Sequence, residues 1–176
     1  MLNRIQRLIA IAALVATGPL FADEAALKSA LNAAENRLSA YLSGSNTCGG
    51  TVNNQTTNHS VTFSWSPGSK RKVTISQSSY TMQDGKRTDM FDATYEIEII
   101  QGETGSLSGT DPTAAGWVKI SAPSVQIKKT VRGVVTMVNE AAIKRPCKNS
   151  PGDFSDIIAE LSRTAKAYWI WARDRG

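Results

Sequence analysis

The sequence predicts an α+β fold: an antiparallel β-meander of five or six strands, with an N-terminal and a C-terminal amphipathic helix packed on one face. Helical periodicity is confined to residues 23–42 and 150–172. Between them, apolar and polar residues alternate with a period of two over several short segments. Such alternation is typical of antiparallel strands with one buried face, which two amphipathic helices can cover.

Residues 1–22 predict a cleavable secretory signal peptide. Two arginines precede an uninterrupted apolar run over residues 8–16, Pro19 breaks that run, and Ala22 supplies a small residue at the cleavage point. The run is shorter than the roughly 20 apolar residues that span a bilayer. An uncleaved N-terminal anchor is the alternative. We expect residues 23–176 to form a single α+β domain without a transmembrane anchor, in the periplasm or secreted.

The mature chain has the size of one ordinary domain. Removal of residues 1–22 from the 176-residue chain leaves 154 residues, which can bury a core of their own. The full chain carries 20 Lys and Arg and 15 Asp and Glu, and loss of the two signal arginines lowers the net charge from +5 to +3. A charge this small does not indicate a nucleic-acid partner, and we expect none.

Cys48 and Cys147 are the two cysteines of the chain. In an oxidising compartment an even number of cysteines indicates disulfide bonding, and two cysteines allow one intramolecular pairing. A pair of buried free thiols is the alternative. The predicted disulfide joins the end of the first helix to the start of the second, so helices on the same sheet face should run antiparallel.

The first helix is predicted over residues 23–42, where the apolar residues follow a helical period and acidic residues begin the segment. Gly44 is expected to end it. Residues 45–59 are rich in polar and turn-forming types, and we expect a loop around Cys48. The apolar stripe of the helix consists of Leu27, Leu31, Ala34, Leu38, Tyr41 and Leu42.

Strands follow from residue 61 onward. Residues 61–66 and 72–77 alternate around a turn at 66–69 and predict a hairpin, and Asp84-Gly85 marks a second turn. Residues 90–100 place five apolar side chains on one face and acidic or Thr side chains on the other. These five are Phe91, Ala93, Tyr95, Ile97 and Ile99.

The second half of the chain is less regular. Residues 101–116 form the longest segment without a predicted element. Pro123 separates two short strand patterns, which fit one bent strand or two. Residues 134–138 are more fully apolar and suggest a central strand, and residues 139–146 are ambiguous. Ser150-Pro151 is expected to cap and begin the C-terminal helix.

The familiar catalytic and metal sites lack their residues. His59 is the only histidine, which excludes a two-histidine metal motif. The segment 105–109 has leucine where a nucleophile elbow has serine, and a disulfide would occupy both thiols. No phosphate-binding glycine motif is present. We therefore expect no metal, no cofactor and no catalysis.

Paired carboxylates are the catalytic alternative that remains. Glu96 and Glu98 lie on one strand face, roughly 7 Å apart by strand geometry, within the range used by inverting glycosidases. Pairing with Lys119 or Lys128 on neighbouring strands would instead make them part of the solvated face.

Two kinds of residue suggest partner contacts. The basic pairs Lys70-Arg71 and Lys86-Arg87 flank predicted turns, where they form a basic rim or simply keep the turns soluble. Trp169 and Trp171 lie beside arginines near the C-terminus, where they either bind a partner or cap the open end of the sheet.

These observations predict a non-catalytic binding or interaction protein of a bacterial-type cell envelope. The expected partner is an envelope protein or an anionic envelope polymer. One alternative is a carrier of apolar, lipid-like ligands with a cavity between the sheet and the C-terminal helix. The other is an envelope hydrolase that uses the two glutamates.

Overall fold

A computed structural model describes residues 23–49, 53–66, 70–100, 106–111, 116–124, 126–146, 149 and 152–175. The predicted signal peptide, the turn at 67–69, Cys147 and the Ser150-Pro151 cap lie outside the described residues.

Two helices begin and end the described chain, as predicted. Helix α2 spans Glu24–Leu42, and the Asp23 carboxylate caps it by accepting a hydrogen bond from the Ala25 amide at 3.1 Å. Helix α3 spans Asp153–Arg175. Its buried side chains, Phe154, Ile157, Ile158, Leu161, Ser162 and Ala165, lie on the face that the apolar period indicates.

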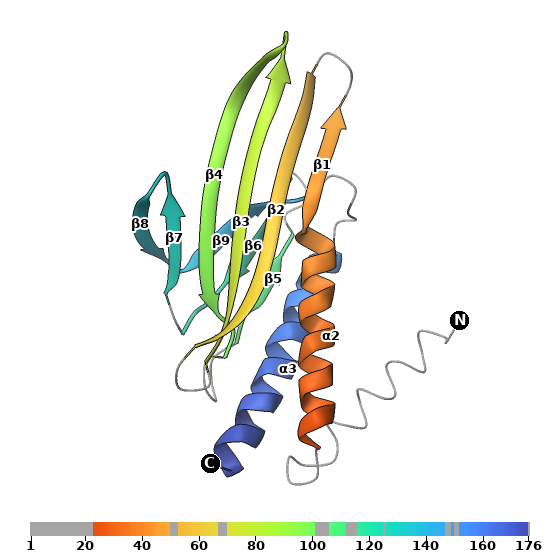
Figure 1. Cartoon of the computed structure of the whole chain (residues 1–176), viewed down its shortest axis with the longest axis vertical. Helices are drawn as coiled ribbons and strands as arrows, with labels where there is room; N and C mark the ends of the chain where they lie inside the picture. Colours follow the sequence, from red (N-terminus) through yellow and green to blue (C-terminus); the bar gives the residue numbers. More distant parts are fainter. Residues whose placement is uncertain are drawn as a thin grey trace, which may run out of the picture.

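The large sheet has six antiparallel strands in the order β1-β2-β3-β4-β7-β8, which confirms the predicted meander. Strands β2 and β3 have 14 residues each, and the upper part of β1 to β4 rises beyond the helices (Figure 1). The strands are β1 Gly44–Gly49, β2 Asn53–Ser66, β3 Lys70–Gln83, β4 Lys86–Glu98, β7 Ile127–Val131 and β8 Val134–Val138.

A second sheet of three strands was not predicted. It consists of β5 Ser108–Thr110, β6 Trp117–Ser121 and β9 Glu140–Lys144, in the order β5-β6-β9. The Gln77 side chain fixes it to β3, because its Nε2 donates to the Ala142 carbonyl at 2.9 Å and its Oε1 accepts from the Lys144 amide at 2.8 Å. The Tyr95 hydroxyl also donates to the Ala142 carbonyl, at 2.9 Å.

The two helices run antiparallel on the same side of the large sheet, as expected (Figure 1). Arg37 forms an ion pair with Glu160, and the rings of Tyr41 and Phe154 are 5.5 Å apart. The core lies between these helices and the inner faces of both sheets. Its least exposed side chains include Leu31, Leu38, Val73, Ile75, Ile97, Ile143, Ile158 and Leu161.

Three expectations about the middle of the chain were wrong. The expected loop at 45–59 is wrong: residues 45–49 lie in β1 and residues 53–59 lie in β2, because antiparallel pairing satisfies the backbone of these polar residues. Strand β5 lies within residues 101–116. Strand β8, expected in the centre of the sheet, is its edge strand. Pro123 separates β6 from β7, which belong to different sheets.

Candidate functional site

The predicted contact residues lie at opposite ends of the molecule. Lys70 and Arg71 begin β3, and Trp169 and Trp171 lie in the last turns of α3, at the lower end of the view in Figure 1. Lys86 and Arg87 begin β4 at the upper tip of the long strands. The structure therefore brings the first basic pair near the tryptophans and does not bring the second.

Aromatic rings from β2 and α3 meet at the lower end. The ring centroid of Trp65 lies 5.4 Å from that of Tyr168, and Tyr168 lies 5.9 Å from Trp171. These distances are typical of interacting aromatic pairs. Trp65 is 47% exposed, whereas Trp169 and Trp171 are half-buried, so the exposed tryptophan is one that sequence reasoning did not select. The sequence feature that could have identified Trp65 is the period-two alternation that it shares with Val61 and Phe63.

Arg71 contacts two aromatic rings of β2. Its guanidinium carbon is 4.8 Å from the ring centroid of Trp65 and 5.7 Å from that of Phe63. Its Nε and Nη2 donate to the two carboxylate oxygens of Glu35 at 2.7 and 2.5 Å. Arg71 and Glu35 are both buried, so Arg71 holds the aromatic rings in place and does not reach solvent.

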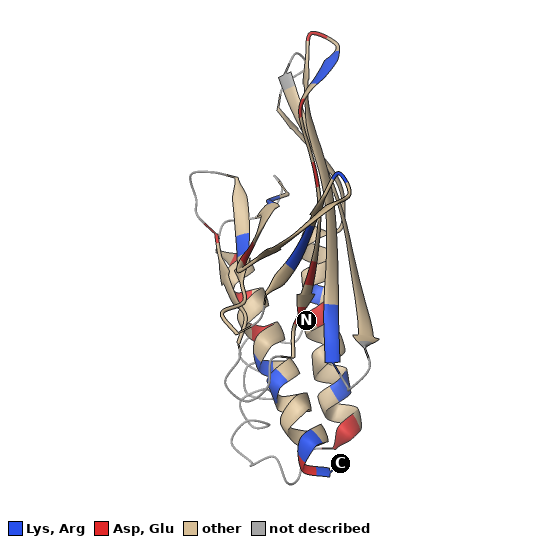
Figure 2. Cartoon of the chain, turned by 90° about the vertical axis from the view of Figure 1, so that its left-hand side faces the viewer, with Lys and Arg blue, Asp and Glu red and all other residues tan. Residues whose placement is uncertain are grey.

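Two further arginines stack on the tryptophans of α3. Arg173 lies 5.1 Å from the ring centroid of Trp169, and Arg175 lies 5.1 Å from that of Trp171. Both arginines are exposed. We call the whole set the aromatic–arginine cluster: Phe63, Trp65, Arg71, Tyr168, Trp169, Trp171, Arg173 and Arg175. Figure 2 shows basic residues along both helices and at this end.

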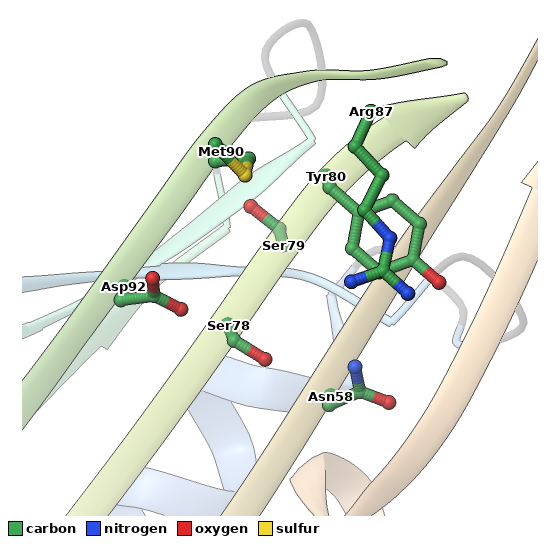
Figure 3. A pocket seen from close by; sticks show the side chains of 7 residues that line it. All are labelled: Asn58, Ser78, Ser79, Tyr80, Arg87, Met90 and Asp92. Atoms are coloured by element: carbon green, nitrogen blue, oxygen red, sulfur yellow. The ribbon is translucent and has the colours of Figure 1, made fainter. Parts of the chain in front are cut away.

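A shallow groove of about 270 Å³ lies on the outer face of β2, β3 and β4, near their upper tip (Figure 3). The Arg87 guanidinium lies 4.3 Å from the ring centroid of Tyr80 and closes one end of the groove. A β-bulge between Ser79 and Thr81, with Asp89 at a φ of 49°, distorts the pairing here. The lining residues are Asn58, Ser78, Ser79, Tyr80, Arg87, Met90 and Asp92.

Glu96 is held between two lysines. Lys128 and Lys72 each donate to its carboxylate at 2.7 Å, and these hydrogen bonds, that from Lys128 first, lower the pKa of Glu96. A general acid needs the opposite shift. Glu98 lies 3.5 Å from Lys70, whereas Lys119, named from sequence as a partner of these glutamates, pairs with Glu140 in the small sheet.

His59 lies on the inner face of β2 and is 7% exposed. Neither ring nitrogen has a hydrogen-bond partner within the described part of the chain. Burial lowers the pKa of His59, while the Lys144 backbone and the Gln77 side chain act weakly in the other direction. The described residues contain no cluster of His, Cys, Asp or Glu suited to a metal ion. None of the described helices has the length and apolarity needed to cross a membrane.

Cys48 lies in β1 and is not a free thiol. Cys147 lies outside the described residues, so the Cys48–Cys147 bond stays a prediction. The Asn149 side chain donates to the Tyr41 carbonyl at 2.5 Å, which places Asn149 beside the end of α2.

No protein-family model matches the chain, and no curated protein or solved structure matches it either. Function therefore has to be inferred from the chemistry of the surfaces described above.

Proposed function

We propose that this chain is an exported, non-catalytic binding protein of the cell envelope, and that its aromatic–arginine cluster binds an anionic envelope polymer. The observation that carries the proposal is that aromatic rings and arginines gather at one end of the fold: Trp65 is 47% exposed there, and the exposed Arg173 and Arg175 stack on Trp169 and Trp171.

The two residue types of the cluster suit the two parts of an anionic glycan. Rigid aromatic rings supply contact area for sugar rings at low entropic cost. A guanidinium that stacks on a ring keeps N–H donors at its edge, where they can bind carboxylate or phosphate oxygens.

The charge balance of this end predicts moderate affinity. Three of the four basic residues at this end have an acidic partner. Lys70 lies near Glu98, Arg71 pairs with Glu35, Arg173 pairs with Asp174, and Arg175 is the fourth. Arg71 is committed to Glu35, and Arg173 pairs with Asp174 at 2.8 Å. The positive excess is therefore small, and stacking must supply much of the binding energy. Binding should weaken with added salt, since exposed charges are screened.

The two alternative functions have less support. For a hydrolase, Glu96 would have to donate a proton, yet two lysines stabilise its charged form. For an apolar carrier, the strands that should line a cavity supply Ile97 and Tyr95, and both side chains lie in the core at 1% exposure or less. The groove at Tyr80 and Arg87 lies on the outer face of the sheet, away from this core.

Titration of residues 23–176 with alginate, an anionic polyuronate, tests the proposal. Dextran serves as the neutral polymer. We expect alginate to bind in a salt-dependent manner, and dextran to bind much more weakly. Replacing Trp65 and Arg175 together by alanine should weaken alginate binding about tenfold, the effect of a loss of ~1.4 kcal/mol.

The matched control replaces Lys86 and Arg87 by alanine, which changes charge at the other end of the molecule. This control should bind alginate as the unmodified chain does. Equal binding of dextran, or an equal loss in the Lys86/Arg87 variant, would overturn the assignment to the aromatic–arginine cluster. Calorimetry or a change in tryptophan fluorescence reports the binding.

A further inference from the structure

Strand β8 is an apolar edge strand that lies open to solvent. It is the last strand of the large sheet, and it forms the outermost strand on the left of Figure 1. Val134, Val135 and Met137 are 65%, 52% and 51% exposed. Residues 134–138 contain neither a charge nor a proline, the two features by which proteins usually protect an open edge.

The opposite edge of the same sheet is different. Strand β1 consists of Gly, Ser, Asn, Thr and Cys, and its first and last glycines have φ values of 116° and 109°. Strand β1 also lacks a charge and a proline, but its small polar residues offer little apolar area to a partner. The exposed apolar area is therefore what distinguishes the β8 edge.

The turn before β8 determines which backbone groups point outward. Arg132 and Gly133 have φ values of 49° and 79°, as in a two-residue type I′ turn, and Val131 pairs with Val134. In such a hairpin the flanking pair is hydrogen-bonded and the pairs then alternate. The N–H and C=O groups of Val135 and Met137 consequently point away from β7, toward the open edge.

We propose that a second copy of this chain pairs with β8 as an antiparallel strand, with the two-fold axis at Thr136. In this register Val135 lies opposite Met137 of the second copy, and each such pair exchanges two backbone hydrogen bonds. Val134 lies opposite Val138 of the second copy on the other face. A two-fold axis at Val135 or at Met137 would use the same outward-pointing N–H and C=O groups, but fewer residues of the two strands would lie opposite each other.

Charge complementarity supports the same register. Arg132 lies in the turn before the strand and Glu140 begins β9 just after it, so the two-fold axis at Thr136 brings the basic end of each β8 to the acidic end of β8 of the second copy. Glu140 is 43% exposed and pairs with Lys119 at 2.9 Å, so one side of its carboxylate can accept a second cation. An antiparallel self-pairing of this kind is closed, since the same surface serves on both copies.

Concentration-dependent sedimentation of the full chain lacking residues 1–22 tests the proposal. One five-residue strand from each copy makes a small interface, so a monomer–dimer equilibrium in the micromolar range or weaker is expected. Met137→Lys should shift the protein to monomer at every concentration. Met90→Lys is the matched control, because Met90 is 61% exposed on β4 and should leave the equilibrium unchanged. A chain that is monomeric throughout, or a Met137→Lys dimer, would overturn the proposal.

A charge exchange tests the register itself. In Arg132→Glu the facing charges become two acids, and in Glu140→Arg they become two bases, so each variant alone should dimerise at least several-fold more weakly. An equimolar mixture restores both opposite-charge contacts and should form heterodimers. Far-ultraviolet circular dichroism confirms that each variant is folded. A mixture that associates no better than its components would refute the register.

Crosslinking gives an independent readout. Facing residues in a non-hydrogen-bonded pair have Cα atoms about 4.5 Å apart, within the range of a disulfide. Thr136→Cys should therefore form a covalent dimer under mild oxidation, whereas Thr62→Cys, an exposed position in β2, should not. Equal crosslinking at both positions, or crosslinking at neither, would contradict the two-fold axis at Thr136.

Discussion

Replacing Glu35 by glutamine should destabilise the fold strongly. Glu35 and Arg71 are 5% and 9% exposed and form a bidentate pair that joins α2 to β3. Glutamine keeps the shape of the side chain but leaves the Arg71 charge buried without a counter-charge. Loss of one partner of a buried ion pair costs about 3–5 kcal/mol. This is a large part of the ~5–15 kcal/mol by which domains of this size are usually stable.

Urea unfolding followed by circular dichroism measures this loss. With a slope near ~2 kcal/mol per molar urea, the expected change lowers the midpoint by about 1.5–2.5 M. The matched control is Glu24→Gln, which removes an exposed i,i+4 pair with Lys28 from the same helix. That change should leave the midpoint almost unchanged, because the pair is exposed and screened by solvent.

A double-mutant cycle completes the test. Arg71→Met alone leaves Glu35 buried and unpaired, whereas Arg71→Met combined with Glu35→Leu removes both charges. The double variant should be more stable than either single variant, because an apolar pair can replace a buried ion pair at little cost. If Glu35→Gln costs no more than Glu24→Gln, the interpretation of the buried pair is wrong.

Three further outcomes are expected. The pKa of His59 is lower in the folded than in the unfolded chain, so the unfolded chain is protonated first and stability should fall as the pH drops below about 6.5. Urea midpoints measured between pH 7.5 and 5 should therefore fall less in His59→Gln than in the unmodified chain. The pKa of Glu96 is also lowered in the folded chain, so its ion pairs should add less than about 1 kcal/mol to the free energy of unfolding at neutral pH, and this contribution should disappear as the pH falls through that pKa. Glu96→Gln should therefore be less stable than the unmodified chain at pH 7 and about equally stable in acid. In Gly109→Ala the new Cβ would lie 2.9 Å from Cβ and Cγ1 of Ile158, which should lower stability by about 1–3 kcal/mol; Ile158→Ala, which removes Cγ1, should cost less in the Gly109→Ala background than in the unmodified chain, as thermal unfolding would show.

The regular parts of the fold could be predicted because each has a strong local pattern. Helix α2 combines an apolar period with an acidic cap, and β4 alternates from Phe91 to Ile97. The turn at Asp84-Gly85 follows from residues that tolerate positive φ, and both have it, at 49° and 74°. Local chemistry alone therefore determines these elements.

The parts that were missed depend on distant partners. Residues 45–49 and 53–59 contain few apolar side chains, and only pairing with each other and with β3 makes them strands. The small sheet depends on Gln77, which lies 65 and 67 residues from its hydrogen-bond partners. Strand β8 was placed in the centre because its residues are apolar, although an apolar strand at an edge is expected when a partner covers it.

The candidate site was predicted in part. The basic and aromatic residues near Arg71 and Trp171 were selected from sequence, but their contact with Trp65 depends on how β2 meets α3. Arg87 was selected as part of a basic rim and instead stacks on Tyr80 beside a groove. Sequence can identify such residue types, whereas their neighbours follow from the fold.

The packing of the first helix against the last has a kinetic consequence. Arg37 and Glu160 are 123 residues apart in sequence, and the core between α2 and α3 can close only after nearly the whole chain is available. For long-range contacts of this kind, the entropic cost of closing the loop comes before the contacts can lower the free energy, and folding is slow for this reason. A nascent or partly translocated chain would therefore stay unfolded until α3 emerges. Such a delay suits a polypeptide that residues 1–22 predict to be threaded across a membrane before it folds.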